Sequence, residues 1–200
     1  MTAVAAAARG NGRLQDVLAA AVDTFSSKGY RATSMRDIAD AVGLSKPALY
    51  YYVTSKEELL VQLYEHVLDA NLAAARRIAA DTEDPMTALR SVLVDRIRYT
   101  CENRRLLQIF FEEEAELPAR LTRKVRNQRR RYEDALIELL ARAAERGEAR
   151  LDAPPRLVVN SLLGAANWTY KWYDAAGPLS PTALGETLAD ILLRMVREPS

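Results

Sequence analysis

The chain has 200 residues, of which 49% are hydrophobic and 28% charged, and its formal net charge is +1. This balance is typical of a globular protein, and the length allows one or two domains with a buried core. A net charge near zero excludes a polyanion partner held by bulk charge alone, so any basic surface must be local. The single cysteine, Cys101, cannot form an intramolecular disulfide, and we therefore expect a cytoplasmic protein.

The N-terminal segment MTAVAAAARGNG is rich in alanine, but its basic residue Arg9 follows the apolar run instead of preceding it. A signal peptide has the opposite order. No apolar run in the sequence approaches the ~20 residues that a membrane-spanning helix needs. We expect residues 1–12 to form a flexible tail, and we expect no membrane partner.

The remaining sequence has helical periodicity throughout. Glycine and proline are few, and apolar residues recur at spacings of three and four, which is typical of helices that bury one face. Cap residues, glycines and prolines mark the ends of these helices. The predicted helices cover approximately residues 13–28, 34–42, 46–52, 55–80, 85–102, 106–114, 118–146, 154–173 and 181–197. No segment has a strand pattern, so an all-α fold of about nine helices is predicted.

Residues 34–52 contain a helix of two turns, a turn with Gly43, and a second short helix. Thr33 or Ser34 can cap the first helix, and Ser45 can cap the second, with Pro47 in its first turn. The preceding helix has an apolar face that can pack across both. This order is typical of a helix-turn-helix, whose second helix enters the DNA major groove.

The second short helix lies within the stretch SKPALYYYVTSKEELL. Its N-terminal residues 45–48 are expected to face base edges. Successive side chains of a helix are about 100° apart, so the three adjacent tyrosines cannot share one face. We expect Tyr52 to pack inward, and we expect Tyr50 and Tyr51 to flank the base-facing residues and to contact phosphate.

Helix starts can also bind phosphate through their free N–H groups. Lys56 begins the long helix 55–80 and is predicted to form a second phosphate site, and Thr33 a third. The predicted DNA-contacting residues are Thr33, Ser34, Ser45, Lys46, Pro47, Ala48, Tyr50, Tyr51 and Lys56. The alternative is that the tyrosines fill a core and the lysines are merely solvated.

The segment GYRATSMRDIADAVGLSKPALYYYVTSKEELL closely resembles the N-terminal domain of the TetR/AcrR family of transcriptional regulators. The resemblance covers roughly residues 13–60. Tyr52 and Val53 stand where His and Phe are common in the family, and both look like packing changes. Pro47 replaces a frequent Gly and should alter base contacts without abolishing them.

The resemblance implies a homodimeric repressor that binds a palindromic operator and responds to a small-molecule effector. It also implies a DNA-binding domain over residues 13–60 and an effector-binding and dimerisation domain over residues 61–200. In the family the last two long helices pack against the same two helices of the second subunit and form a four-helix bundle. Small and apolar residues on these helices agree with that role, although packing within one chain is the alternative. The predicted dimer residues are Leu162, Gly164, Ala165, Leu184, Leu188, Ile191, Leu192 and Met195.

The segment NWTYKWYDAAGPLSPTALGETLADILLRM is similar to one TetR subgroup. That subgroup includes regulators of fatty-acid and steroid catabolism that respond to acyl-CoA thioesters. Aromatic residues with a few basic residues suit a ligand that has an apolar tail and an anionic head. They also suit a protein core beside solvated cations. The predicted effector-binding residues are Arg104, Phe110, Phe111, Trp168, Lys171 and Trp172.

Two other functions remain open from the sequence. One is a helical module that binds a small molecule without contacting DNA, and the other is a helical-bundle enzyme such as a small hydrolase. The enzyme is disfavoured because the sequence lacks a Gly-rich phosphate loop, a convincing Ser/His/Asp arrangement and a metal-spaced cluster. We predict no cofactor and no metal. The identity of the effector and the operator sequence do not follow from the sequence.

Overall fold

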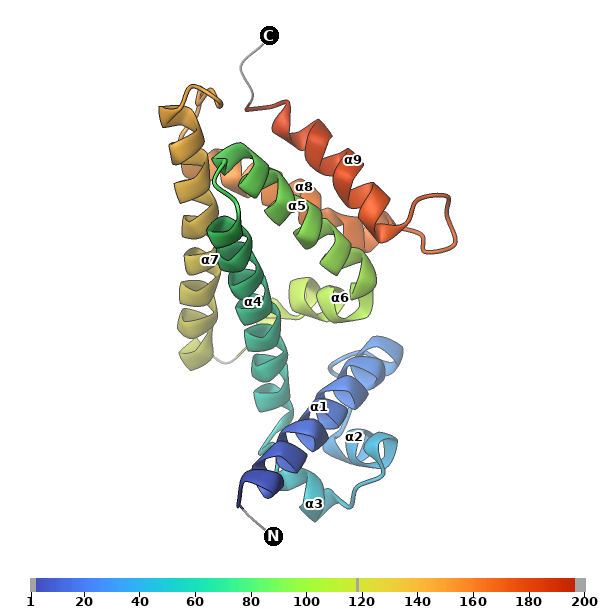
Figure 1. Cartoon of the computed structure of the whole chain (residues 1–200). Helices are drawn as coiled ribbons and strands as arrows, with labels where there is room; N and C mark the ends of the chain where they lie inside the picture. Colours follow the sequence, from blue (N-terminus) through green and yellow to red (C-terminus); the bar gives the residue numbers. More distant parts are fainter. Residues whose placement is uncertain (1–2, 118, 197–200) are drawn as a thin grey trace. The chain divides into compact units, whose positions relative to one another are not determined.

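The computed structural model describes residues 3–117 and 119–196 (Figure 1). Within these ranges the chain forms nine α-helices and one 3-10 helix, with no strand, which confirms the predicted all-α fold. The elements are α1 Ala3–Lys28, α2 Met35–Val42, α3 Lys46–Tyr50, α4 Lys56–Asp81, α5 Pro85–Glu102, α6 Arg104–Glu112, η1 Glu114–Glu116, α7 Ala119–Glu145, α8 Pro155–Trp172 and α9 Pro181–Leu193.

Helix α1 begins at Ala3, although residues 1–12 were expected to form a flexible tail. The described part of that segment continues the helix without a break. Alanine has the highest intrinsic helix propensity, and this segment contains four consecutive alanines. The two glycines that follow cost only about 1 kcal/mol each and do not end the helix.

The start of α2 has a capping box, with Asp37 in the place of the usual glutamate. The Ser34 hydroxyl oxygen accepts a hydrogen bond from the Asp37 N–H at 3.2 Å, and the Asp37 carboxylate accepts one from the Ser34 N–H at 2.8 Å. Hydrogen bonds from Lys28 and Ser34 hold the pKa of Asp37 well below its usual range. Gly43 adopts the left-handed conformation at φ 69° and ends the helix.

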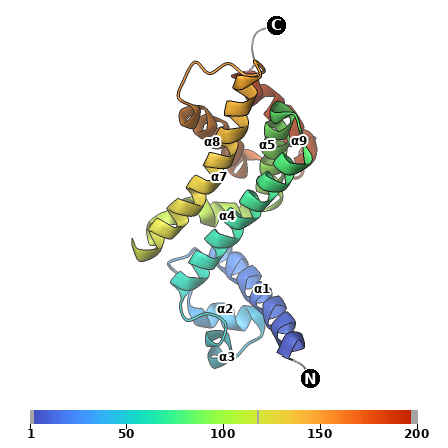
Figure 2. The same ribbon diagram turned by 60° about the vertical axis from the view of Figure 1, so that its left-hand side comes forward.

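The chain divides into two compact units. The first comprises Met1–His66 and Arg105–Arg123, and the second comprises Val67–Arg104 and Lys124–Ser200. In the first unit, α2 packs against α1, and α3 packs against α2 (Figures 1 and 2). Helix α6 also belongs to this unit, because the Phe110 ring packs on the Tyr64 ring at 4.5 Å between centroids. Arg31 pairs with Glu116 at 2.6 Å, which attaches η1 to the loop before α2.

In the second unit, α5 packs against both α8 and α9 (Figure 1). A core of buried aliphatic side chains fills the space among α5, α7, α8 and α9. Gly185 allows α9 to approach α5 closely, since a Cβ added there would lie 2.9 Å from the Val94 carbonyl oxygen. The helix–helix contact that organises this unit therefore depends on one residue without a side chain.

Replacing Gly185 by alanine is expected to destabilise the second unit by about 1–3 kcal/mol, the usual cost of overpacking a core. The neighbour is backbone, so it cannot move aside as a flexible side chain would. Urea unfolding followed by circular dichroism would measure the change. Thr182→Ala, an exposed substitution on the same helix, is the control and should leave the midpoint nearly unchanged. A Gly185→Ala protein as stable as the control would show that α9 is free to shift away from α5.

Candidate nucleic-acid interface and dimer surface

Helix α3 is held by its buried side and exposes its start. The Ser45 hydroxyl oxygen accepts a hydrogen bond from the Ala48 N–H at 3.3 Å, and Pro47 lies in the first turn. On the inner side Leu49 is fully buried, and Val53 just after the helix is also buried. This anchoring fixes the orientation of the helix, because rotation would expose Leu49.

The outer side of α3 carries the residues predicted to face DNA. Ser45, Lys46 and Pro47 are exposed and Ala48 is half-buried. Tyr50 is 41% exposed and Tyr51 is 85% exposed, whereas Tyr52 is half-buried. The tyrosines therefore separate as the 100° rotation per residue predicts. Their contact with DNA stays a prediction, but the exposure that it requires is present.

Thr33 differs from the sequence-based expectation. Its side chain is buried, and its hydroxyl donates a hydrogen bond to the Gly29 carbonyl oxygen at 2.8 Å. Ser34, not Thr33, caps α2, and its exposed hydroxyl also donates to Asp37 at 2.7 Å. The Thr33 side chain therefore fastens the loop after α1, and its phosphate contact stays a prediction.

The Lys56 ammonium also points inward. Its Nζ atom donates hydrogen bonds to the carbonyl oxygens of Tyr30 at 2.8 Å, Thr33 at 3.0 Å and Arg31 at 3.3 Å. It also lies 4.5 Å from the centre of the Tyr30 ring. An ammonium has three N–H donors, and all three are used here. The predicted phosphate contact of the Lys56 side chain is therefore not supported, and the residue instead ties the start of α4 to the loop before α2.

Helices α8 and α9 of the second unit expose an apolar strip. On α8 it comprises Leu157, Gly164, Trp168 and Trp172, and on α9 it comprises Ile191 and Met195. The spacings of four and seven residues place each set along one helix face. Trp168 is 58% exposed and Met195 is 63% exposed. Large apolar side chains exposed along two neighbouring helices are typical of a protein–protein interface.

The predicted dimer residues fall into two groups. Gly164, Ile191 and Met195 are exposed on the apolar strip, and Ala165 and Leu188 are half-buried beside it. Leu162, Leu184 and Leu192 are instead buried in the core of their own chain. The helical stripe in the sequence did not distinguish these groups, since a stripe shows which residues are apolar and not which neighbour covers them.

The predicted effector residues are divided between the two units. Trp168, Lys171 and Trp172 are exposed on α8, and the Arg104 Nε atom donates to the Tyr170 carbonyl oxygen at 3.1 Å. In the first unit, Phe110 is buried, and its ring meets that of Phe111 edge to face at 5.0 Å. The two tryptophans therefore belong to the apolar strip, and Phe110 to a core.

Two family models match the chain. Residues 17–63 match the model described as bacterial regulatory proteins of the tetR family, and residues 82–196 match the one described as tetracyclin repressor-like, C-terminal domain. The chain belongs to the TetR family. Members of this family are transcriptional regulators and not enzymes, and the helix-turn-helix prediction is confirmed with it.

Individual members of the TetR family resemble the chain over most of its length. The transcriptional repressor KstR2 of Mycobacterium tuberculosis is 27% identical over 185 residues, covering 92% of each chain. The structure of PfmR from Thermus thermophilus is 31% identical, with a TM-score of 0.81 over 89% of this chain and 97% of that one. AibR, in complex with isovaleryl coenzyme A and operator DNA, is 27% identical, with a TM-score of 0.79 over 94% and 100%.

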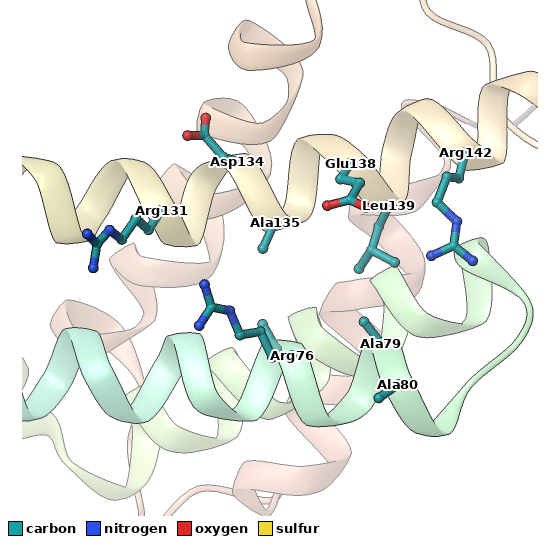
Figure 3. Close-up of a pocket in the computed structure, with 10 residues that line it drawn as sticks. Arg76, Ala79, Ala80, Arg131, Asp134, Ala135, Glu138, Leu139 and Arg142 are labelled. Carbon is teal, nitrogen blue, oxygen red and sulfur yellow. The ribbon is translucent and has the colours of Figure 1, made fainter.

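A polar groove lies between α4 and α7 in the C-terminal unit of this TetR protein, with a volume of ≈ 430 Å³ (Figure 3). Arg76 from α4 and Arg131 from α7 extend into the space between the two helices. Ala135 from α7 and Ala79 and Ala80 from α4 also line this space. The residues that line the groove are Ala75, Arg76, Ala79, Ala80, Arg131, Asp134, Ala135, Glu138, Leu139 and Arg142.

Within residues 3–117 and 119–196, none of the helices has the length and hydrophobicity that a membrane span requires. No group of three or more His, Cys, Asp or Glu side chains in that part of the chain is placed to hold a metal ion.

Proposed function

We propose that the protein is a ligand-responsive repressor that binds a palindromic operator as a homodimer. The observation that carries this proposal is the exposed start of α3, held in place by the buried Leu49, in a chain of the TetR family. An anchored helix with an exposed N-terminal face is the element that a helix-turn-helix protein inserts into the major groove.

Within this proposal, the residues of α3 have different tasks. Lys46 and Ala48 face base edges, and the Tyr50 and Tyr51 hydroxyls donate hydrogen bonds to phosphate oxygens. Lys46 lies 5.9 Å from the centre of the Tyr50 ring, so the two side chains approach the duplex together. Lys56 contributes by holding the loop before α2 and not by contacting phosphate.

The apolar strip on α8 and α9 supports the homodimer. A monomer would leave two tryptophans, an isoleucine and a methionine in water on neighbouring helices. Pairing with the same strip of a second copy buries all of them at once, because a two-fold interface uses one patch twice. The exposed Gly164 lets the partner helix approach closely, since no atom lies within 4 Å of a Cβ built there.

A small-molecule effector completes the proposed regulator. KstR2 is a repressor, and the AibR structure contains both isovaleryl coenzyme A and operator DNA. We therefore propose an acyl-CoA or another apolar, anionic molecule as the effector class. An effector that prefers one spacing of the two DNA-binding units shifts the population between DNA-competent and incompetent states. A coupling of ~1–3 kcal/mol would change operator affinity roughly 5–150-fold.

Lys46→Ala is expected to change which bases the protein prefers at one or two positions of each half-site. Loss of a bidentate contact to a guanine costs about 1–3 kcal/mol of discrimination. Selection from a random duplex pool, followed by sequencing, would measure the preference. Arg77→Ala, an exposed substitution in the second unit, is the control and should select the same sequences as the unaltered protein. Identical preferences for all three proteins would remove Lys46 from the base-facing surface.

A further inference from the structure

A buried arginine lies in the core of the second unit. Arg96, on α5, keeps only 4% of its surface exposed. Its Nε atom donates a hydrogen bond to the Asn167 side-chain oxygen on α8 at 2.7 Å, but its Nη1 atom is buried without a partner. A guanidinium does not lose its proton in proteins, so a full positive charge sits here with an unused donor.

The groups around Arg96 do not neutralise it. Asp95 is the nearest acid, but its carboxylate pairs with Arg98 at 2.6 Å on the partly exposed side of α5. Arg129, from α7, adds a second positive charge that acts on Arg96. Burial lowers the pKa of the Arg96 guanidinium, and Asn167 offers it a neutral oxygen only.

Two tyrosines extend this polar cluster. The Tyr99 hydroxyl, one turn after Arg96 on α5, is buried without a hydrogen-bond partner. Tyr132 enters from α7 and is also buried, and burial raises its pKa to about 12. Burial also raises the pKa of the Tyr99 hydroxyl, so both hydroxyls keep their protons at neutral pH. Each can therefore donate a hydrogen bond, as the unused donor of Arg96 can.

An unpaired buried charge is costly, and native proteins keep such groups mainly at functional sites. A neutral ligand oxygen would satisfy the N–H group but would leave the positive charge uncompensated. A carboxylate would satisfy the N–H group and would also compensate the positive charge. It matches the planar guanidinium with two parallel hydrogen bonds. Aliphatic side chains pack around the cluster, so the body attached to that carboxylate must itself be apolar.

We propose that Arg96, Tyr99 and Tyr132 bind the carboxylate of an apolar organic acid, and that such acids are the effectors of this protein. This inference rests on the proposed function, because it names the chemical class recognised by the regulated unit. The carboxylate can belong to a free fatty acid or to the far end of a dicarboxylic acyl group on coenzyme A. A simple acyl thioester has no carboxylate and does not meet the requirement.

Calorimetric titration of the purified protein tests the proposal with four probes. These are octanoate, octanamide, octanoyl coenzyme A, and the coenzyme A thioester of octanedioic acid. We expect binding of octanoate or of the octanedioic thioester, and at least tenfold weaker binding of octanamide and octanoyl coenzyme A. Octanoate represents a free acid, and the octanedioic thioester represents an acyl-CoA. Comparing the two probes shows which kind of molecule supplies the carboxylate. The proposal is overturned if neither carboxylate binds, or if octanamide binds as well as octanoate.

Two substitutions assign the carboxylate to Arg96. Arg96→Met should weaken binding of the carboxylate probe at least tenfold, whereas Arg77→Gln, an exposed arginine of the same unit, should not. Without ligand, Arg96→Met should melt at the same temperature or higher, because removing a buried unpaired charge is not destabilising. A lower melting temperature with unchanged binding would show that Arg96 only supports the fold.

A gel shift of the unaltered protein without ligand tests the proposed function separately. Carboxylate binding without DNA binding would contradict the repressor and leave the Arg96 site standing. DNA binding without carboxylate binding would contradict the Arg96 site and leave the repressor standing.

Discussion

Lys56→Met is expected to abolish binding to every DNA sequence by loosening the DNA-binding unit. The ammonium donates to three carbonyl oxygens of residues 30–33, and Lys56 also packs against the Tyr30 ring. Methionine can fill much of the same space but donates no hydrogen bond. A hydrogen bond to a charged group is worth about 1.5–3 kcal/mol, so losing all three should cost the unit at least about 4 kcal/mol. The loop before α2 and the start of α4 would then move independently, and α3 lies between them in the chain.

Native-state hydrogen exchange separates this role from a phosphate contact. In the Lys56→Met protein, amides of α2 and of the start of α4 should exchange faster, because the contact that ties the start of α4 to the loop before α2 is lost. Lys46→Met is the matched control, since Lys46 is exposed and has no carbonyl partner of this kind. It should leave exchange unchanged. If Lys56→Met left exchange unchanged and only reduced the salt dependence of DNA binding, Lys56 would be a phosphate ligand after all.

Glutamate at both Ile191 and Met195 is expected to convert the dimer to a monomer and to weaken operator binding by roughly 10²–10⁴-fold. The loss is large because, in a dimer, the DNA-binding unit bound to one half-site holds the other unit close to the second half-site. Burying four carboxylates at a two-fold interface also costs more than the lost apolar contact. Both side chains are exposed in the single chain, so the substitution should leave the fold of each chain intact.

Sedimentation velocity and gel shifts on the same samples measure both effects. The control is Leu179→Glu, which introduces a charge at a different exposed apolar residue, in the loop between α8 and α9. It should remain dimeric and bind the operator normally. A doubly substituted protein that stays dimeric would place the interface elsewhere, and a monomer with full operator affinity would show that dimerisation is not needed for binding.

Local signals in the sequence predicted the DNA-binding unit well. The Ser34 cap, the stop at Gly43 and the Ser45 cap involve residues within a few positions of one another. Such contacts depend on the chain next to them and not on the rest of the fold. The 100° rotation between successive helical residues also predicted that Tyr51 lies on a different face from the buried Leu49. The start of α1 differs from the prediction, because alanine-rich sequence is compatible with a tail as well as with a helix that continues the next one.

Side chains whose partners are distant in the sequence were predicted poorly. Lys56 reaches carbonyl oxygens more than twenty residues away, and nothing in its own segment indicates that direction. Arg96 stands in a helix with two other arginines, and only the packing of α5, α7 and α8 shows that it is buried. Trp168 and Trp172 were predicted to bind the effector. An aromatic pair in a sequence, however, is equally typical of a pocket, a core and an interface.

Hydroxyl-radical footprinting on the duplex upstream of the protein's own coding region tests the central claim most directly. If α3 of two paired chains enters the major groove, the purified protein should protect two segments on one face of the duplex. Their centres should lie one helical turn apart, about 10–10.5 base pairs, or a multiple of it. Both segments should lose protection together when Ile191 and Met195 are replaced by glutamate. No protection on that or any selected duplex, or one segment unaffected by the substitutions, would contradict the account.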